Sequence, residues 1–247
     1  MFVRSRGPAG ARAIVWIHGL GESGLCFEQV AAHEALAGYR HVIPDLPGYG
    51  RSEWRERIAS LTELADELAA WMSGERAPIL VGHSMGGVIG VALAERHPAA
   101  VGAFVNVEGN VTIGDCTSSA IAAAESLEQF VGGGYARLCD RIYDGGATDR
   151  ALRGAYASMR FADPRGYHAH ARELVDVSRD ESMIDRLVAI AARTPTLYVA
   201  GVPGGAAART LELLDAHAIE TARIEPAGHW PFIDQPDAVA RAIAGWI

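Results

Sequence analysis

The length, composition and charge of the chain exclude several classes of protein. With 247 residues, of which 49% are hydrophobic, the chain can bury one sizeable core, and a single domain of this length is ordinary for α/β folds. Its net charge of −8 argues against a nucleic-acid-binding or anionic-membrane surface, since either needs clustered positive charge. The three cysteines lack paired spacing and no apolar stretch reaches membrane-spanning length, so we expect a soluble cytoplasmic protein.

Short apolar runs alternate with amphipathic helical segments along most of the chain. Predicted strands cover residues 13–17, 79–82, 101–107 and 196–201, another lies with its following turn in 41–52, and a last one ends near 226. Predicted helices cover residues 27–36, 61–71, 85–96, 209–216 and 236–247. This alternation indicates βαβ units and therefore an α/β fold with a mostly parallel sheet flanked by helices.

The segment from about 111 to 193 departs from this alternation. It contains no convincing strand, and its alanine-rich amphipathic stretches are broken by glycine pairs and triplets. Because it is too long for a single crossover, we predict an inserted helical cap at 111–193 over the carboxyl edge of the sheet, with residues 1–110 and 194–247 forming the core. The alternative is that these helices are ordinary crossovers on the face of the sheet.

The most informative stretch is Gly82-His83-Ser84-Met85-Gly86, between an apolar strand and a helix. A serine at the apex of so tight a turn is held in a strained backbone conformation that exposes its hydroxyl. Side chains at the two glycine positions would collide with neighbouring elements. The pattern predicts that Ser84 is a nucleophile; the alternative is a glycine-rich turn that only packs or that binds a phosphate.

Four further segments fall in a characteristic order around this turn. They are the strand and His-Gly-Leu-Gly loop at 13–21, the strand and turn at 41–52, the late strand at 196–201, and the loop at 226–231. Together with the serine turn they resemble the α/β-hydrolase family over nearly the whole chain. The resemblance implies a serine nucleophile, a histidine base in the last loop and an oxyanion loop after the first of these strands.

A serine hydroxyl needs a base, and imidazole has a suitable pKa near neutrality. Among nine histidines, His229 is the predicted base because glycine and proline keep its segment a loop after the last strand. His83 is expected to point away from the serine hydroxyl, and His18 to stabilise the oxyanion loop or line the pocket. We expect His168 and His170 to be surface or cap residues.

The oxyanion formed on an attacked carbonyl needs two preorganised N–H donors. The residue after the nucleophile, Met85, is expected to supply one through its backbone, and Leu20 in the oxyanion loop the other. Gly19 and Trp230 are expected to lie at the substrate, although an aromatic residue beside the base could equally serve packing.

The third member of a catalytic triad is missing from its usual place. In most relatives the acid follows the late strand, but here residues 201–205 contain no carboxylate. A minority of the superfamily, including some haloalkane dehalogenases and the pancreatic lipases, carries it after the preceding strand, where this chain has Glu108. A buried carboxylate needs a partner, and His229 is the natural one. Asp45, Asp115 or a solvated Glu108 are the alternatives.

Serine with histidine predicts acyl transfer through an acyl-enzyme followed by water, and excludes dehalogenation and epoxide hydrolysis, which need an aspartate nucleophile. We expect a small-molecule acyl substrate: a fairly apolar carboxylic ester, thioester, lactone or activated amide. An acyltransferase or thioesterase of a biosynthetic pathway, and a non-enzymatic ligand receptor, are the alternatives. No dinucleotide turn and no metal-spaced cluster occurs, so no cofactor, metal, nucleic acid or membrane partner is implied, and the oligomeric state stays open.

Overall fold

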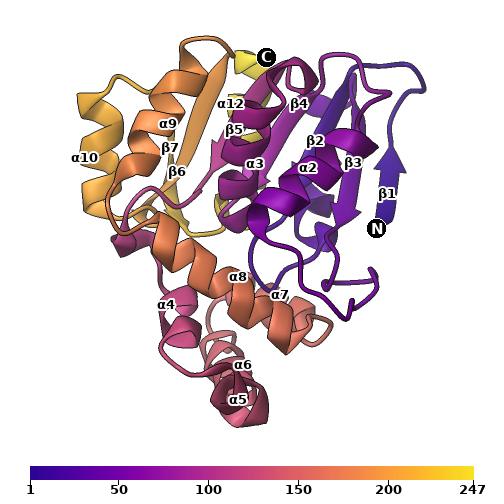
Figure 1. The fold of residues 1–247 in the computed structure, drawn as a ribbon. Helices are drawn as coiled ribbons and strands as arrows, with labels where there is room; N and C mark the ends of the chain where they lie inside the picture. Colours follow the sequence, from indigo (N-terminus) through magenta and orange to yellow (C-terminus); the bar gives the residue numbers. More distant parts are fainter.

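A seven-stranded sheet with helices on both faces forms the body of the protein (Figure 1). The structure is a computed structural model that describes all residues from 1 to 247. Its strands are β1 (Phe2–Arg6), β2 (Ala13–Ile17), β3 (Arg40–Asp45), β4 (Ile79–His83), β5 (Ala103–Val107), β6 (Thr196–Gly204) and β7 (Thr221–Gly228). In the sheet they lie in the order β1-β3-β2-β4-β5-β6-β7, and only β1 runs antiparallel to its neighbour. The predicted α/β fold is confirmed.

The helices belong to two groups, one around the sheet and one inserted between β5 and β6. The first group is α1 (Glu28–Ala31), α2 (Leu61–Trp71), α3 (Met85–Arg96), α9 (Ser182–Ala191), α10 (Ala208–Ala216), α11 (Pro231–Asp234) and α12 (Pro236–Trp246). The second is α4 (Ser118–Ala123), α5 (Leu127–Gln129), α6 (Tyr135–Gly145), α7 (Arg150–Met159) and α8 (Pro164–Val177). Short 3₁₀ helices lie at Gly24–Phe27, Glu34–Leu36, Pro98–Ala100 and Ile113–Asp115, and one π-helical turn at Phe130–Gly134. No helix is both long and apolar enough to span a membrane.

Each face of the sheet has its own apolar core, because successive strand residues point to opposite faces. In β2, Val15 and Ile17 join the cluster that contains α2, α3 and α9, whereas Ile14 and Trp16 join the cluster that contains α12. All four side chains are buried. The polar groups at the carboxyl ends of the strands are thereby held by a framework that is packed on both sides.

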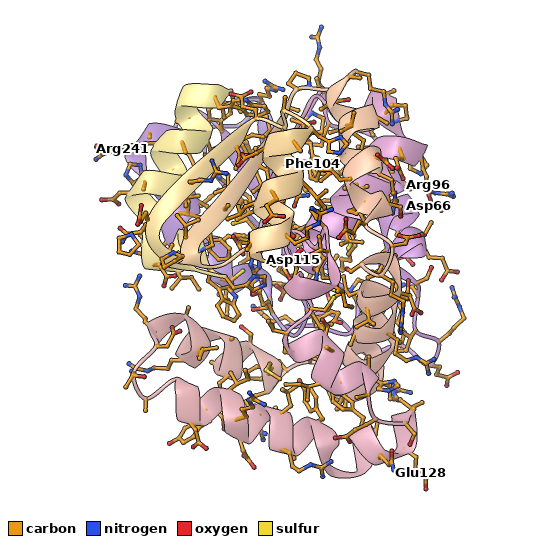
Figure 2. The ribbon with its side chains drawn as sticks, turned by 90° about the vertical axis from the view of Figure 1, so that its left-hand side faces the viewer. Asp66, Arg96, Phe104, Asp115, Glu128 and Arg241 are labelled. Carbon is orange, nitrogen blue, oxygen red and sulfur yellow. The ribbon has the colours of Figure 1, made fainter.

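The helices α4–α8 stand away from the sheet at the carboxyl ends of its parallel strands (Figure 1). In the perpendicular view, Asp115 lies where this group meets the core, and Glu128 lies at its far end (Figure 2). A small apolar cluster of their own, including Phe130, Leu138 and Tyr167, holds these helices together. The division into core and cap stays a prediction, and α4–α8 are the part of 111–193 that occupies the predicted place.

Helix α9 lies inside the predicted cap segment but packs on the sheet. Its apolar side chains, Met183, Ile184, Leu187 and Ile190, are buried in the same cluster as α2 and α3. It therefore serves as the crossover helix that returns the chain to β6. The prediction missed this because the amphipathic pattern of a crossover helix is the same as that of a cap helix.

The other predicted helices agree with the structure except the first. Helices α2 and α3 have the predicted bounds, and α10 and α12 agree to within one residue. A single helix over 27–36 is wrong: the backbone turns extended at His33, where the imidazole Nδ1 accepts the Ala35 N–H and starts a separate 3₁₀ turn. Strand β1 was not predicted.

The placement of α9 predicts that two excisions behave differently. Replacing residues 118–177 by a Gly-Ser linker should leave the sheet folded, because only Ala162 and Leu174 of this segment belong to the two sheet cores. Extending the excision to 192 should abolish cooperative unfolding: four buried apolar side chains contribute roughly 6–12 kcal/mol, about the whole stability of a domain. Thermal unfolding followed by far-ultraviolet circular dichroism measures both. Equal melting temperatures would contradict the assignment of α9 to the core.

Candidate active site

Ser84 occupies a sharp turn between β4 and α3. Its backbone has φ of 51° and ψ of −115°, a conformation that side chains rarely adopt, and its amide donates to the Val107 carbonyl at 3.0 Å. Such strain, about 1–3 kcal/mol, persists only where the surroundings fix it, and it is concentrated at functional sites. The hydroxyl is left at the carboxyl edge of the sheet, at the N-terminus of a twelve-residue helix.

The glycines on either side of Ser84 are there because the turn leaves no room for a side chain. A Cβ at Gly82 would overlap the Gly86 carbonyl, and a Cβ at Gly86 would overlap the carbonyl of Ile17 on neighbouring β2. The collision expected from the sequence is thus observed, and it arises because α3 begins directly against the sheet.

The imidazole of His229 meets the carboxylate of Glu108. His229 follows the end of β7 and Glu108 follows the end of β5; the distance from His229 Nδ1 to Glu108 Oε2 is 3.2 Å. The Glu108 side chain is 1% exposed and that of His229 is 28% exposed. One side of the ring is therefore bound to a buried carboxylate, and the ring remains accessible from the cavity.

The Glu108 carboxylate fills the place that the late strand leaves empty. Its Oε1 accepts N–H groups from Gly201 at 2.6 Å and Ala206 at 3.1 Å. A Cβ at Gly205 would lie 2.6 Å from this same oxygen. The loop after β6 thus lacks an acid of its own and instead binds the acid of the neighbouring strand.

Glu108 also has a positive φ, 55°, and its amide donates to the Val199 carbonyl at 3.0 Å. Ser84 and Glu108 are thus strained residues at corresponding ends of adjacent strands.

The pKa of His229 is set by opposing effects. Burial lowers it, but the hydrogen bond and charge of Glu108, with the charges of Glu22 and Asp115, outweigh burial and raise the pKa above 6.5.

Two backbone N–H groups beside Ser84 have no hydrogen-bond partner. Met85 is the first residue of α3, so its N–H has no carbonyl within the helix, and the N–H of Leu20 is also unpaired. Gly19 does not line the cavity, contrary to the expectation that it contacts substrate, because its N–H turns toward Glu22 at 2.7 Å.

A cavity of about 450 Å³ opens over these groups. Ser84, His229, Leu20 and Trp230 line it from the core, and the apolar side chains it receives from the cap segment include Ile121, Leu138, Ile142 and Leu152. The volume is in the range of small-molecule sites. The Ser84 hydroxyl forms no hydrogen bond with His229, whose Nδ1 is bound to Glu108.

The alternative acids lie elsewhere. Asp45 accepts hydrogen bonds from Arg4, Gly24 and Arg51, and so organises the turn after β3. Asp115 accepts the amides of Val111, Thr112 and Ala207 and the hydroxyl of Thr210. Neither carboxylate hydrogen-bonds to His229.

Three other histidines are structural. His18 is fully buried and does not line the cavity; it accepts the Leu46 N–H and so holds the loop at 18–21. His168 and His170 belong to α8, inside the predicted cap segment, and of the two expected positions, surface or cap, the surface position is the one that the structure contradicts. Both are buried, where they bond to the carbonyls of Glu125 and Ala59.

The residue that sequence reasoning missed is Glu22. It is 3% exposed and accepts hydrogen bonds from Gly19, His83 and the Trp230 indole. Burial raises its pKa, but the charge and hydrogen bond of His83, with the bonds from Trp230 and Gly19, lower it to about 2. The available signal was a carboxylate in an otherwise small and apolar loop. No group of three or more His, Cys, Asp and Glu side chains has the arrangement of a metal site.

Comparison with known sequences identifies the family. A sequence model described as the alpha/beta hydrolase family matches residues 14–242. The chain belongs to the alpha/beta hydrolase family. Lipase LipV of Mycobacterium tuberculosis is 31% identical over 119 residues, which are 46% of this chain and 43% of LipV. The chain spans less than half the length of the curated relatives it matches first.

Solved structures of the alpha/beta hydrolase family share the fold over almost the full length. A thermophilic esterase from Thermogutta terrifontis has a TM-score of 0.80 at 21% identity, covering 99% of this chain and 92% of the esterase. The enol-lactonase from Burkholderia xenovorans LB400 has a TM-score of 0.79 at 18% identity, covering 99% and 95%. At these identities the likeness establishes the fold.

The His229–Glu108 contact predicts a titration that can be measured without any substrate. In the wild type, ¹⁵N NMR of the histidine rings should place the His229 pKa above 6.5. Glu108→Gln should lower it, because the amide cannot stabilise the imidazolium and would favour the opposite ring tautomer. Glu128→Gln, an identical change at the far end of the cap, should leave it unchanged. A Glu108→Gln titration identical to that of the wild type would contradict the pairing.

Proposed function

We propose that the protein hydrolyses carboxylic ester-type bonds, in esters, thioesters or lactones, through an acyl-enzyme on Ser84. The observation that carries the proposal is the combination of a strained serine and a carboxylate-bound histidine at one cavity. The strain at Ser84 and the burial of the Glu108 charge are both costly to maintain. A purely ligand-binding protein would have no need of both.

The positions of the groups support the following reaction. His229 Nε2 removes the proton as the Ser84 oxygen attacks the carbonyl carbon, and Glu108 stabilises the imidazolium through Nδ1. The N–H groups of Leu20 and Met85, together with the positive end of α3, stabilise the oxyanion. His229 then protonates the leaving alcohol or thiol. Water, activated by the same histidine, attacks the acyl-enzyme and releases the acid.

The cavity favours a substrate of small to medium size with an apolar part. Its cap side presents Leu138, Ile142 and Leu152, and Trp230 forms the wall beside the base. The names of similar proteins point to the same chemistry, since they include a lipase, an esterase and an enol-lactonase.

Ser84→Ala tests the proposal directly. A fluorophosphonate probe should label the wild type once, at Ser84, and p-nitrophenyl esters should be hydrolysed. Ser84→Ala should lose both, with kcat lower by about 10⁴–10⁶-fold, because the members of a triad act as a unit. Intact-protein mass spectrometry and ester hydrolysis provide the two readouts.

Ser73→Ala, at an exposed serine, is the matched control and should keep both properties. If a clean preparation of folded Ser84→Ala kept more than a few per cent of the activity, Ser84 would not be the nucleophile. Labelling at Ser84 without turnover of any ester or thioester would contradict hydrolysis as the function.

A further inference from the structure

His83 is buried between two groups that can only accept hydrogen bonds. Its Nδ1 lies 3.0 Å from Glu22 Oε2, and its Nε2 lies 2.8 Å from the backbone carbonyl oxygen of His229. The ring is fully buried, so no water can take the place of either partner. A carbonyl and an ionised carboxylate both lack a proton to donate. The geometry thus places an acceptor at each of the two ring nitrogens of His83.

The other buried histidines of the core lack this arrangement. His18 accepts the Leu46 N–H on one nitrogen and faces the Gly19 carbonyl with the other, so a neutral ring satisfies both. His41 likewise accepts the Trp16 indole N–H and faces a carbonyl. A neutral ring suits both cases, and burial lowers the pKa of both residues. His83 is different because a carboxylate lies against it.

That carboxylate reaches two parts of the site at once. Glu22 Oε2 accepts the Gly19 N–H, which fixes the loop where the free N–H of Leu20 lies. Glu22 Oε1 accepts the indole N–H of Trp230, the residue that follows His229. Through His83 it also reaches the carbonyl of His229 itself. Glu22 and His83 thus contact both the oxyanion loop and the loop that bears His229.

We propose that Glu22 and His83 form a buried, charged positioning pair that ties the oxyanion loop to the loop bearing His229. The pair fixes the positions of the Leu20 N–H and the His229 imidazole relative to the Ser84 hydroxyl. The inference rests on the proposed function for its catalytic consequence, but the charge state of the pair does not depend on any activity.

Glu22 and His83 also contribute to the electrostatic environment that sets the pKa of His229. Glu108 faces His229 from the end of β5, Asp115 from the 3₁₀ turn after it, and Glu22 from the oxyanion loop. The His83 ring lies 4.8 Å from the His229 ring between centroids. A positive His83 offsets the charge of Glu22 at this distance. Removing only His83 would leave Glu22 uncompensated and raise the pKa of His229.

The first test is the protonation state of His83 in the wild-type protein. Long-range ¹H–¹⁵N NMR of the histidine rings should show that both nitrogens of His83 are protonated, as the two acceptors at the ring require. His83→Gln assigns the signal; should that variant fail to fold, contacts of the ring with Phe232, 4.8 Å away, assign it instead. A neutral His83 ring, with one protonated nitrogen, would overturn the proposal.

The second test separates the charge of Glu22 from its shape. Glu22→Gln can still accept the Gly19 N–H but cannot hold an imidazolium, so His83 should become neutral and kcat should fall about tenfold with little change in KM. Glu22→Ala loses every contact and should cost about 10²–10³-fold, the effect of losing an oxyanion donor. Glu34→Gln, the same change at an exposed glutamate, is the control.

A third readout distinguishes positioning from simple stabilisation of the fold. In His83→Gln the acid limb of kcat/KM should move to higher pH, whereas loss of stability alone would lower activity at every pH without moving the limb. Wild-type kcat in Glu22→Gln would overturn the proposal. If no ester is hydrolysed by the wild type, the proposed function fails while the NMR result still decides the charged pair.

Discussion

The buried carboxylate of Glu108 is the constraint on which the arrangement of the site depends. A carboxylate that is 1% exposed must be satisfied by donors, because an unpaired buried charge costs several kcal/mol. Here the donors come from β6 itself, through Gly201, from the loop after it, through Ala206, and from the loop after β7, through His229. The Glu108 carboxylate therefore links the ends of β5, β6 and β7, which are distant in the sequence. It also holds the His229 ring so that the ring faces the cavity.

The contact between Glu108 and His229 follows from the geometry of a parallel sheet. Strands β5 and β6 are neighbours and end at the same edge, so a carboxylate after either strand can reach a histidine after β7. When the acid follows β5, the loop after β6 must supply N–H donors and leave space. Gly205 leaves that space, because a side chain there would collide with the carboxylate.

Much of the fold could be predicted from local patterns, and the limits have physical reasons. The strands that build the centre of the sheet are apolar runs buried on both faces, and α2 and α3 carry a clear periodicity or a clear start at the turn. The role of α9 could not be predicted, because an apolar helical stripe does not specify what it covers. The turn-forming behaviour of His33 depends on one side-chain hydrogen bond that composition does not reveal.

For the site, the motif around Ser84 and the empty acid position led to residues that the structure brings together. The burial of Glu22 was not predictable, since its partners, His83 and Trp230, lie 61 and 208 residues away in the chain. Pairing over such separations is decided by the fold and has no local signature. Gly19 shows the same limit: its position was read from the loop, but the direction of its N–H depends on Glu22.

The most direct test of the account is a crystal structure of the protein with a phosphonate ester bound covalently to Ser84. The phosphonyl oxygen imitates the oxyanion and should lie about 2.7–3.1 Å from the backbone nitrogens of Leu20 and Met85. His229 should remain bound to Glu108, with Nε2 directed at the Ser84 oxygen. An adduct whose phosphonyl oxygen points away from both nitrogens, or a His229 ring detached from Glu108, would contradict the central claim.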